Sequence, residues 1–215
     1  CVIRSLADVS RAWSALGGLP LIVEEWIHFS RELSVIATRD QRGEIAFYPI
    51  SYNVHSGGIL HRSEAPAPAL SPALRASAFT AAQKVLETLE YVGTLAIELF
   101  EVDGKILANE LAPRVHNSGH ASIEGVVTSQ FENHIRAITG TSLGSVEPRA
   151  STVMFNIIGS IPELSAIERL SNSFIHLYGK TPREGRKLGH ITLTNPSESE
   201  EQLVDTLCCR SRNAA

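Results

Sequence analysis

The sequence contains no apolar run close to the roughly 20 residues that a membrane-spanning helix needs. Its first residues also lack the charged, apolar and small-residue order of a signal peptide. No long Lys/Arg run is present, and the formal net charge is -4 at pH 7, which argues against a surface that binds nucleic acid by neutralising phosphates. These absences predict a cytoplasmic protein that binds neither membrane nor nucleic acid.

Cysteine is scarce as well. The 3 cysteines are Cys1 and the adjacent pair Cys208 and Cys209, a spacing that gives neither a disulfide framework nor a C-x-x-C metal pair. We expect all three to be reduced thiols, and their spacing assigns them no chemistry.

What is present is the composition of a globular protein. The 215 residues are 43% hydrophobic and 20% charged, enough for one sizeable core or two small ones. The first residue is Cys1 rather than Met, and a helix signal follows almost at once. We therefore expect the chain to be a piece of a longer protein.

Residues 109–120 hold the densest group of chemically useful side chains. One carboxylate, one arginine, two histidines and two asparagines surround Pro113 and Gly119 within these twelve residues. Ordinary packing does not require so many metal-binding and anion-binding groups, so the stretch predicts an active-site loop.

A β-hairpin is predicted just upstream, because residues 94–100 and 105–110 are β-rich and are joined through Asp103-Gly104. If the loop has three residues, Val102 faces Ile106, Phe100 faces Ala108 and Glu98 faces Glu110. Facing carboxylates are destabilising unless a cation such as Mg²⁺ neutralises them. A two-residue loop would shift this register, and the alternative interpretation is two exposed carboxylates at strand ends.

Before this hairpin, the pattern predicts a helix with a capping box at residues 5–8 that ends at Gly17-Gly18. A buried strand is then expected over residues 21–27, followed by a hairpin of residues 32–39 and 44–48 around a turn at residues 40–43. Residues 51–68 show no clear period and predict a long functional loop.

Two further helices are predicted. Ser71 and Pro72 begin one whose buried face is Leu74, Ala78, Ala81, Val85 and Leu89. Thr128 is the expected cap of another, which places Phe131, Ile135 and Ile138 on its apolar face and ends at Gly140.

The C-terminal third predicts short strands over residues 151–158, 174–178 and 190–193, with a basic turn at residues 179–187. The acidic residues from Pro196 onward suggest a surface helix or a frayed tail.

Several short motifs run in one order from about residue 22 to 190, and together they resemble one enzyme family. The motifs are Ile22-Val23-Glu24-Glu25, Arg31-Glu32, Phe47-Tyr48-Pro49, Asn53-Val54-His55, Gly58-Ile59-Leu60, Tyr91-Val92-Gly93, the loop at 109–120, Thr128-Ser129-Gln130-Phe131-Glu132, Tyr178-Gly179-Lys180 and Gly185-Arg186-Lys187-Leu188-Gly189-His190. Their order resembles the C-terminal part of an ATP-grasp enzyme, specifically the ATP-dependent 5-(carboxyamino)imidazole ribonucleotide synthetases of purine biosynthesis.

The resemblance implies an α+β ATP-grasp fold, with a mixed or antiparallel sheet and flanking helices, plus a small C-terminal β subdomain. Residues 1–145 would be the ATP-grasp region, with the end of the lid subdomain at about 1–23. Residues 146–195 would be the small subdomain and residues 196–215 the helix or tail. The family's N-terminal α/β domain and its Gly-rich phosphate loop would lie outside this chain, which alone should not be a competent catalyst.

The implied reaction is that of a ligase. ATP phosphorylates bicarbonate to carboxyphosphate, and the exocyclic amine of aminoimidazole ribonucleotide receives the carboxyl group. Carboxyphosphate is unstable in water, so the site must exclude solvent. The implied partners are these small molecules, Mg²⁺ or Mn²⁺, a second copy in a homodimer, and a fused or separate mutase or carboxylase.

The resemblance also implies residue roles. Glu24, Glu25, Trp26 and Ile27 would contact adenine, Glu32 the ribose, and His55 the nucleotide. Glu98 and Glu110 would hold the metal, with Glu110 and Asn109 also at the nucleotide phosphates. Arg114, His116 and Asn117 would bind bicarbonate or carboxyphosphate, since a guanidinium suits an oxyanion. Lys180 and Arg186 would bind the phosphate of the imidazole ribonucleotide.

Two alternatives remain open at this point. One is another ATP-grasp carboxylate-amine ligase with a different acceptor. The other is a non-catalytic nucleotide-binding module.

Overall fold

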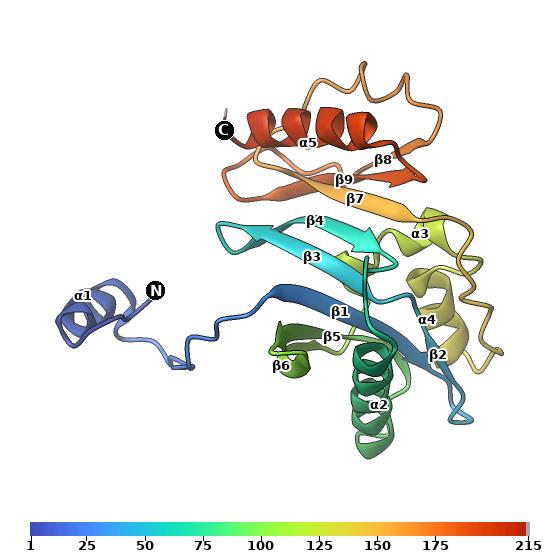
Figure 1. Cartoon of the computed structure of the whole chain (residues 1–215), viewed down its shortest axis with the longest axis horizontal. Helices are drawn as coiled ribbons and strands as arrows, with labels where there is room; N and C mark the ends of the chain where they lie inside the picture. Colours follow the sequence, from blue (N-terminus) through green and yellow to red (C-terminus); the bar gives the residue numbers. More distant parts are fainter. Residues whose placement is uncertain (214–215) are drawn as a thin grey trace.

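The computed structural model describes residues 1–213, which form one nine-stranded sheet with flanking helices (Figure 1). The strands are β1 (Arg31–Arg39), β2 (Ile45–Phe47), β3 (Ser51–Ser56), β4 (Ile59–Ala65), β5 (Gly93–Val102), β6 (Lys105–Ala112), β7 (Thr152–Ile158), β8 (Ser173–Leu177) and β9 (Lys187–Thr194). They lie in the order β6-β5-β1-β3-β4-β7-β9-β8, and β2 pairs with β1. Every pairing between described strands is antiparallel, and the expected α+β class is confirmed.

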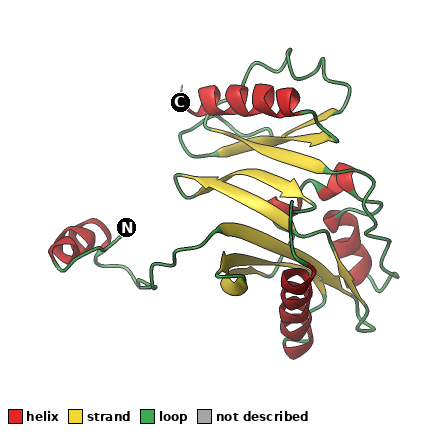
Figure 2. Cartoon of the chain, in the orientation of Figure 1, coloured by secondary structure: helices red, strands yellow, loops and turns green. Residues whose placement is uncertain are grey.

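Apart from α1 (Ala7–Leu16), the helices lie around this sheet, as the colouring by secondary structure shows (Figure 2). They are α2 (Pro72–Thr88), a 3-10 turn η1 (Asn117–Gly119), α3 (Ser122–Gly125), α4 (Gln130–Ile138) and α5 (Glu198–Asn213). None of the described helices is long and apolar enough to cross a membrane.

The largest core lies between α2 and one face of the central strands. Leu33, Val35 and Ala37 of β1 are fully buried there, with Ala82 and Leu86 of α2. The predicted cap is confirmed, since the Leu74 N–H donates to Ser71 Oγ at 3.2 Å. The predicted buried face was partly wrong: the helix buries Leu74, Ala78, Ala82 and Leu86, whereas Leu89 is exposed.

α4 buries polar side chains, contrary to the prediction. Its cap is Ser129 rather than Thr128, because Ser129 Oγ accepts from the Glu132 N–H at 3.2 Å. Gln130 and Asn133 are fully buried, whereas the expected apolar face of Phe131, Ile135 and Ile138 is exposed. The reason is hydrogen bonding: Asn133 Nδ2 donates to the buried Tyr48 hydroxyl at 2.9 Å, and Gln130 bonds main-chain groups of the site loop.

The predicted loop over residues 51–68 is instead the hairpin of β3 and β4. Its two-residue turn, Gly57-Gly58, has φ of 60° and 76°, which suits a primed hairpin turn. The strands have polar side chains on one face, such as Asn53 and Ser63, so the sequence showed no apolar period. The hairpin of β1 and β2, by contrast, was predicted correctly.

The predicted buried strand over residues 21–27 is wrong. The segment forms no strand in the described chain, and Ile22 and Val23 are 82% and 85% exposed. It leads from α1, which stands apart from the sheet in Figure 1, to β1. Its anchor lies further along, where the Phe29 ring stacks on Phe100 at 4.4 Å and the Ser30 N–H donates to the Glu101 carbonyl at 2.9 Å.

The C-terminal strands extend the same sheet, because β7 pairs with β4. The predicted strands there are confirmed as β7, β8 and the longer β9. They share a second core with Val204 and Cys208 of α5, so the acidic C-terminal segment is a packed helix rather than a frayed tail. The domain boundaries at residues 145 and 195 stay a prediction.

We predict that Ser71→Ala lowers the free energy of unfolding by about 1 kcal/mol, because the first turn of α2 loses its side-chain cap. Urea unfolding followed by circular dichroism measures the change. The matched control is Ser77→Ala, an exposed position within the same helix, where alanine should be neutral or slightly stabilising. Equal losses in both variants would contradict the capping role.

Candidate functional site

The face of the central sheet opposite α2 is polar. Residues directly opposite each other on paired strands point to the same face, and the pairings place Glu98 beside Glu110 and Ser34, and Glu32 beside Asn53. A hydrogen-bonded row fixes this face, in which Asn53 Nδ2 donates to Ser34 Oγ at 2.6 Å and Ser63 Oγ donates to Asn53 Oδ1 at 2.8 Å. The polar face, as we call it, consists of Glu32, Ser34, Asn53, His55, Ser63, Glu98 and Glu110.

Glu98 and Glu110 face each other, as predicted, but for a different reason. The turn has two residues, Asp103-Gly104, with φ of 48° and 71°, so Phe100 faces Leu107 and not Ala108. A β-bulge between Leu99 and Glu98 then leaves Asn109 as an extra residue and restores the pairing of Glu98 with Glu110. The three-residue turn was wrong, and the facing carboxylates are confirmed.

The carboxylates on this face interact unfavourably. Burial raises the pKa of Glu98, and the charges of Glu110 and Glu32 raise it further, while His55 and Lys187 oppose them. Two carboxylates that face each other on one sheet face suit a divalent metal ion with oxygen ligands.

Glu32 and His55 form the second ionisable pair of the polar face. His55 Nδ1 hydrogen-bonds a carboxylate oxygen of Glu32, and both side chains are mostly buried. The contact joins β1 to β3 next to Glu98. The hydrogen bond fixes the position of the Glu32 carboxylate at one end of the polar face.

The loop at residues 113–120 covers part of this face and is held by Gln130. The Gln130 side chain accepts from the His116 N–H at 3.0 Å and donates to the His116 carbonyl at 2.7 Å. A Cβ on Gly119 would lie 2.7 Å from Gln130 Oε1, so a larger residue here would displace the Gln130 side chain that holds the loop. His116 Nδ1 then lies 2.9 Å from Ser118 Oγ, and its Nε2 lies 3.7 Å from Glu98 Oε1.

Asn117 connects the loop to the C-terminal strands. Its amide exchanges two hydrogen bonds with Asn156 of β7, at 2.9 and 2.7 Å. Its Oδ1 also accepts from Lys187 Nζ of β9 at 2.9 Å. Burial lowers the pKa of Lys187, while the charge of Glu98 raises it.

Lys187 is the site residue that our sequence analysis did not assign. It lies in the basic turn and was quoted within a motif, but nothing in the pattern distinguished it from Lys180 and Arg186. The structure distinguishes Lys187 from Lys180. Lys187 is half-buried against the loop, whereas Lys180 is exposed and its Nζ lies 5.1 Å from the centre of the Tyr178 ring. A bulge in β9, where Leu188 is the extra residue, precedes the regular pairing with β7.

The remaining predicted residues lie around the rim. Arg114 is exposed and donates to the Val115 carbonyl at 3.0 Å, and Arg186 bonds the Thr181 carbonyl at 3.4 Å. A groove lies between the extended N-terminal segment and the β5–β6 hairpin. It is lined by Glu24, Glu25, Trp26, Ile27, Phe100 and Asn109, among others, so it brings the four residues expected at adenine next to Asn109.

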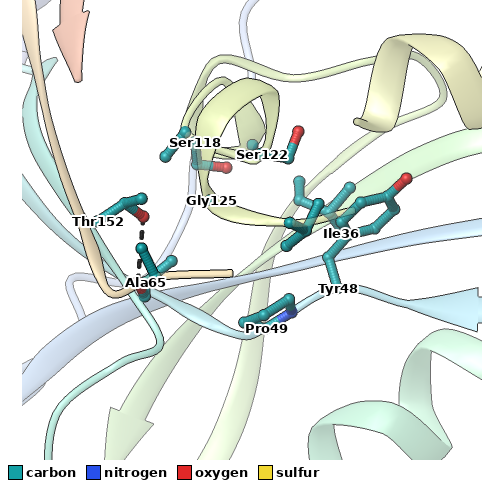
Figure 3. A pocket seen from close by; sticks show the side chains of 12 residues that line it. Ile36, Tyr48, Pro49, Ala65, Ser118, Ser122, Gly125 and Thr152 are labelled. Carbon is teal, nitrogen blue, oxygen red and sulfur yellow. Dashed lines mark hydrogen bonds between the residues drawn. The ribbon is translucent and has the colours of Figure 1, made fainter. Parts of the chain in front are cut away.

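A second pocket lies behind the site loop and contains none of the predicted site residues. Figure 3 shows its lining, in which Ile36, Tyr48 and Pro49 face Ser118 and Ser122. Thr152 Oγ1 donates to the Ala65 carbonyl at 3.1 Å at its edge. Its wall is mostly apolar and has no charged group, so we do not assign the site chemistry to it.

The fold agrees with the comparisons with known proteins. The ATP-grasp domain family matches residues 1–131, and the chain therefore belongs to the ATP-grasp family. The phosphoribosylaminoimidazole carboxylase C-terminal domain matches residues 152–202.

The similar curated proteins are more specific. The chain is 46% identical over 192 residues to the N5-carboxyaminoimidazole ribonucleotide synthase of Pseudomonas aeruginosa, covering 89% of this chain and 52% of that protein. It is 39% identical over 205 residues to the enzyme of the same name from Bacillus subtilis, and the match covers 93% of this chain and 53% of that protein. The chain thus spans about half the length of these relatives.

Solved structures agree. The synthetase from Thermus thermophilus superposes with a TM-score of 0.89 at 47% identity, over 95% of this chain and 57% of that one. The synthase from Aspergillus clavatus superposes with a TM-score of 0.88 at 36% identity, over 96% of this chain and 58% of that one. That structure is a complex with ADP and 5-aminoimidazole ribonucleotide.

We predict that His116, His120 and His190 are uncharged at neutral pH. Burial is the main cause that lowers their pKa, to about 4 for His116 and His120 and to about 3 for His190. An unfolded histidine takes up its proton near pH 6.5. Their contribution to stability is therefore complete above pH 6.5 and is lost as the pH falls toward about 4.

Imidazole carbon–proton NMR spectra recorded across this range test the prediction. We expect three resonances that keep the chemical shift of neutral imidazole down to about pH 5, assigned by His→Gln variants. A titration midpoint near 6.5 for any of these three histidines would contradict it.

Proposed function

We propose that the full-length protein is an ATP-dependent ligase that carboxylates the exocyclic amine of 5-aminoimidazole ribonucleotide with bicarbonate. The observation that carries the proposal is the proximity of opposite charges: the acidic pair Glu98 and Glu110 lies on the sheet, and Lys187, which bonds Asn117, is close enough for its charge to lower the pKa of Glu98. Curated relatives with the matching sequence bear the name of this enzyme.

The nucleotide would bind between the N-terminal segment and the β5–β6 hairpin. The groove at Glu24 to Ile27 offers exposed apolar surface from Trp26, which suits the flat adenine ring. Glu32, fixed by His55, would accept hydrogen bonds from the ribose hydroxyls. Glu98 and Glu110, with Asn109 beside them, would hold Mg²⁺, which when bound neutralises charge on the phosphate oxygens.

Two displacement steps follow. A bicarbonate oxygen attacks the γ-phosphorus of ATP, and ADP leaves, which gives carboxyphosphate. The amine nitrogen of the ribonucleotide then attacks the carboxyl carbon, the bond to the phosphate oxygen breaks, and the nitrogen loses a proton.

The loop at residues 113–120 would bind the oxyanions in these steps. With His116 neutral, the positive charge comes from Arg114 and Lys187, and His116 and Asn117 supply hydrogen bonds. The clamp of Gln130 on His116 keeps these groups in place before substrate arrives.

The ribonucleotide phosphate would lie on the basic turn. Lys180 is exposed and Arg186 is partly buried, and both lie in the same segment as Lys187. A phosphorylated acceptor accounts for these two cations, whereas a neutral acceptor needs neither.

The first experiment measures ADP formation by the full-length protein with Mg-ATP and bicarbonate, with and without 5-aminoimidazole ribonucleotide. Stimulation by the ribonucleotide, with N5-carboxyaminoimidazole ribonucleotide as the product, supports the proposal. ADP formation that no imidazole ribonucleotide stimulates would overturn the acceptor.

We predict that Glu110→Gln in the full-length protein lowers kcat by about 100-fold or more, because the acidic pair loses one charge at nearly constant shape. The control is Glu87→Gln at an exposed position of α2. Neither variant should unfold at a lower temperature than the parent, because Glu110→Gln removes a repulsion from Glu98. Activity of Glu110→Gln close to that of the parent would contradict the metal role.

We predict that Lys180→Ala raises the KM for the ribonucleotide more than the KM for ATP, because the phosphate of the acceptor loses a cation. Steady-state kinetics with each substrate varied in turn measure both constants. Lys84→Ala, on the exposed side of α2, should change neither. An equal effect on both substrates would mean that the basic turn does not bind the acceptor.

A further inference from the structure

A second cluster of ionisable side chains lies where β4 meets the C-terminal helix α5. His61 Nε2 lies 2.5 Å from Asp205 Oδ1 and 3.6 Å from Cys209 Sγ, and the sulfur lies 3.9 Å from the same carboxylate oxygen. One ligand atom from each residue therefore lies within 4.8 Å of the other two. None of the three belongs to the polar face described above.

Local backbone structure brings the three residues together. Val54 pairs with Arg62 and His55 with Leu60, so His61 is the extra residue of a β-bulge, a feature that redirects side chains. Asp205 and Cys209 are four residues apart on α5 and so lie on one helical face. His61 is 6% exposed, and its ring packs edge-on against Phe155 at 6.0 Å.

The geometry does not suit a Cys-His-Asp relay. In such a relay one ring nitrogen faces the nucleophile and the other faces the carboxylate. Here the sulfur and the carboxylate approach the same atom, Nε2 of His61. Three donor atoms that converge on one point, rather than forming a chain, are the arrangement that a metal ion requires.

The distances fit a tetrahedral ion. Bond lengths of about 2.3 Å to sulfur and about 2.0–2.1 Å to nitrogen and oxygen place the sulfur about 3.6 Å from each of the other two donors, and nitrogen and oxygen about 3.4 Å apart. The two distances to Cys209 Sγ are within about 0.3 Å of these values. The His61–Asp205 distance must widen by about 0.9 Å, and the Asp205 side chain, 48% exposed, has room to move.

The surrounding charges also permit a cation. The nearest basic side chain on β4 is Arg62, and two carboxylates balance it: Glu201 of α5 at 2.6 Å and Glu64 at 2.9 Å. Its guanidinium is thus fixed by carboxylates. The described charged side chains of α5 at this patch, Glu201 and Asp205, are both acidic, so they favour a cation.

We propose that His61, Asp205 and Cys209 form a binding site for a divalent transition metal, with Zn²⁺ as the best match. Imidazole, thiolate and carboxylate together suit this ion, whereas Mg²⁺ prefers oxygen ligands alone. Three protein ligands leave one position for water. The ion would join the last helix of the chain to the β3–β4 hairpin, 144 residues earlier in the sequence.

Cobalt is the probe, because Co²⁺ takes the place of Zn²⁺ in such sites and a cobalt–thiolate bond gives a charge-transfer absorption in the near ultraviolet. The protein carries Cys1→Ser, which removes the exposed Cys1 thiol, and is freed of metal with a chelator. We expect one equivalent of Co²⁺ to produce the band, Zn²⁺ to displace Co²⁺, and Zn²⁺ to raise the Tm, since three converging ligands bind the ion more tightly in the folded chain than in the unfolded one.

The variants are Cys209→Ser and His61→Gln, with Cys208→Ala as the matched control. Cys208 is the adjacent thiol, but it is buried in the C-terminal core. Cys209→Ser should lose the band and weaken Zn²⁺ binding by more than the roughly 10–100-fold that loss of an outer partner costs. Cys208→Ala should keep both the band and the affinity.

Two results would overturn the proposal. One is that Co²⁺ produces no cobalt–thiolate band in the protein that retains both Cys208 and Cys209. The other is a band that survives Cys209→Ser or that disappears with Cys208→Ala while unfolding remains cooperative.

Discussion

Two carboxylates that face each other across a β-ladder are the constraint on which the rest of the site depends. Glu98 and Glu110 repel each other, and partial burial of Glu98 makes its charge more costly still. A stable fold without function would place an apolar or oppositely charged pair there. The Glu32–His55 pair, the clamped loop and Lys187 lie near these carboxylates, so the polar face brings acidic and basic groups together.

The continuity of the sheet explains how the cationic part reaches the acidic part. β7 pairs with β4, so the C-terminal strands are held by main-chain hydrogen bonds to the same sheet that carries the acids. Asn156 of β7 then bonds Asn117 of the loop, and Lys187 of β9 bonds the same amide. The two cores of the chain are thus joined at the site itself, and a displacement of either core would move Lys187 relative to Glu98.

Local signals in the sequence were sufficient for several elements. The cap at Ser71 and the hairpin of β1 and β2 depend on interactions between near neighbours, and the structure contains both. The predicted loop at residues 109–120 is a loop only from Pro113 onward, because residues 109–112 belong to β6. The predictions failed where distant contacts decide. Residues 51–68 form strands whose inward side chains are polar because they line the site, and α4 buries Gln130 and Asn133 because a loop and a tyrosine bond them. The exposed apolar segment at residues 21–27 has no strand partner in the described chain, although its composition is that of a core strand.

The bulge at Asn109 determines which residues of β6 pair with β5 in the hairpin. In a regular ladder from the two-residue turn, Asn109 would face Glu98, and Glu110 would face Ile97, whose side chain belongs to the core under α2. That slipped pairing would press a carboxylate toward apolar groups, a placement that costs several kcal/mol. The charge of Glu110 therefore disfavours the slipped register of β6 on β5 during folding, before any ligand is present.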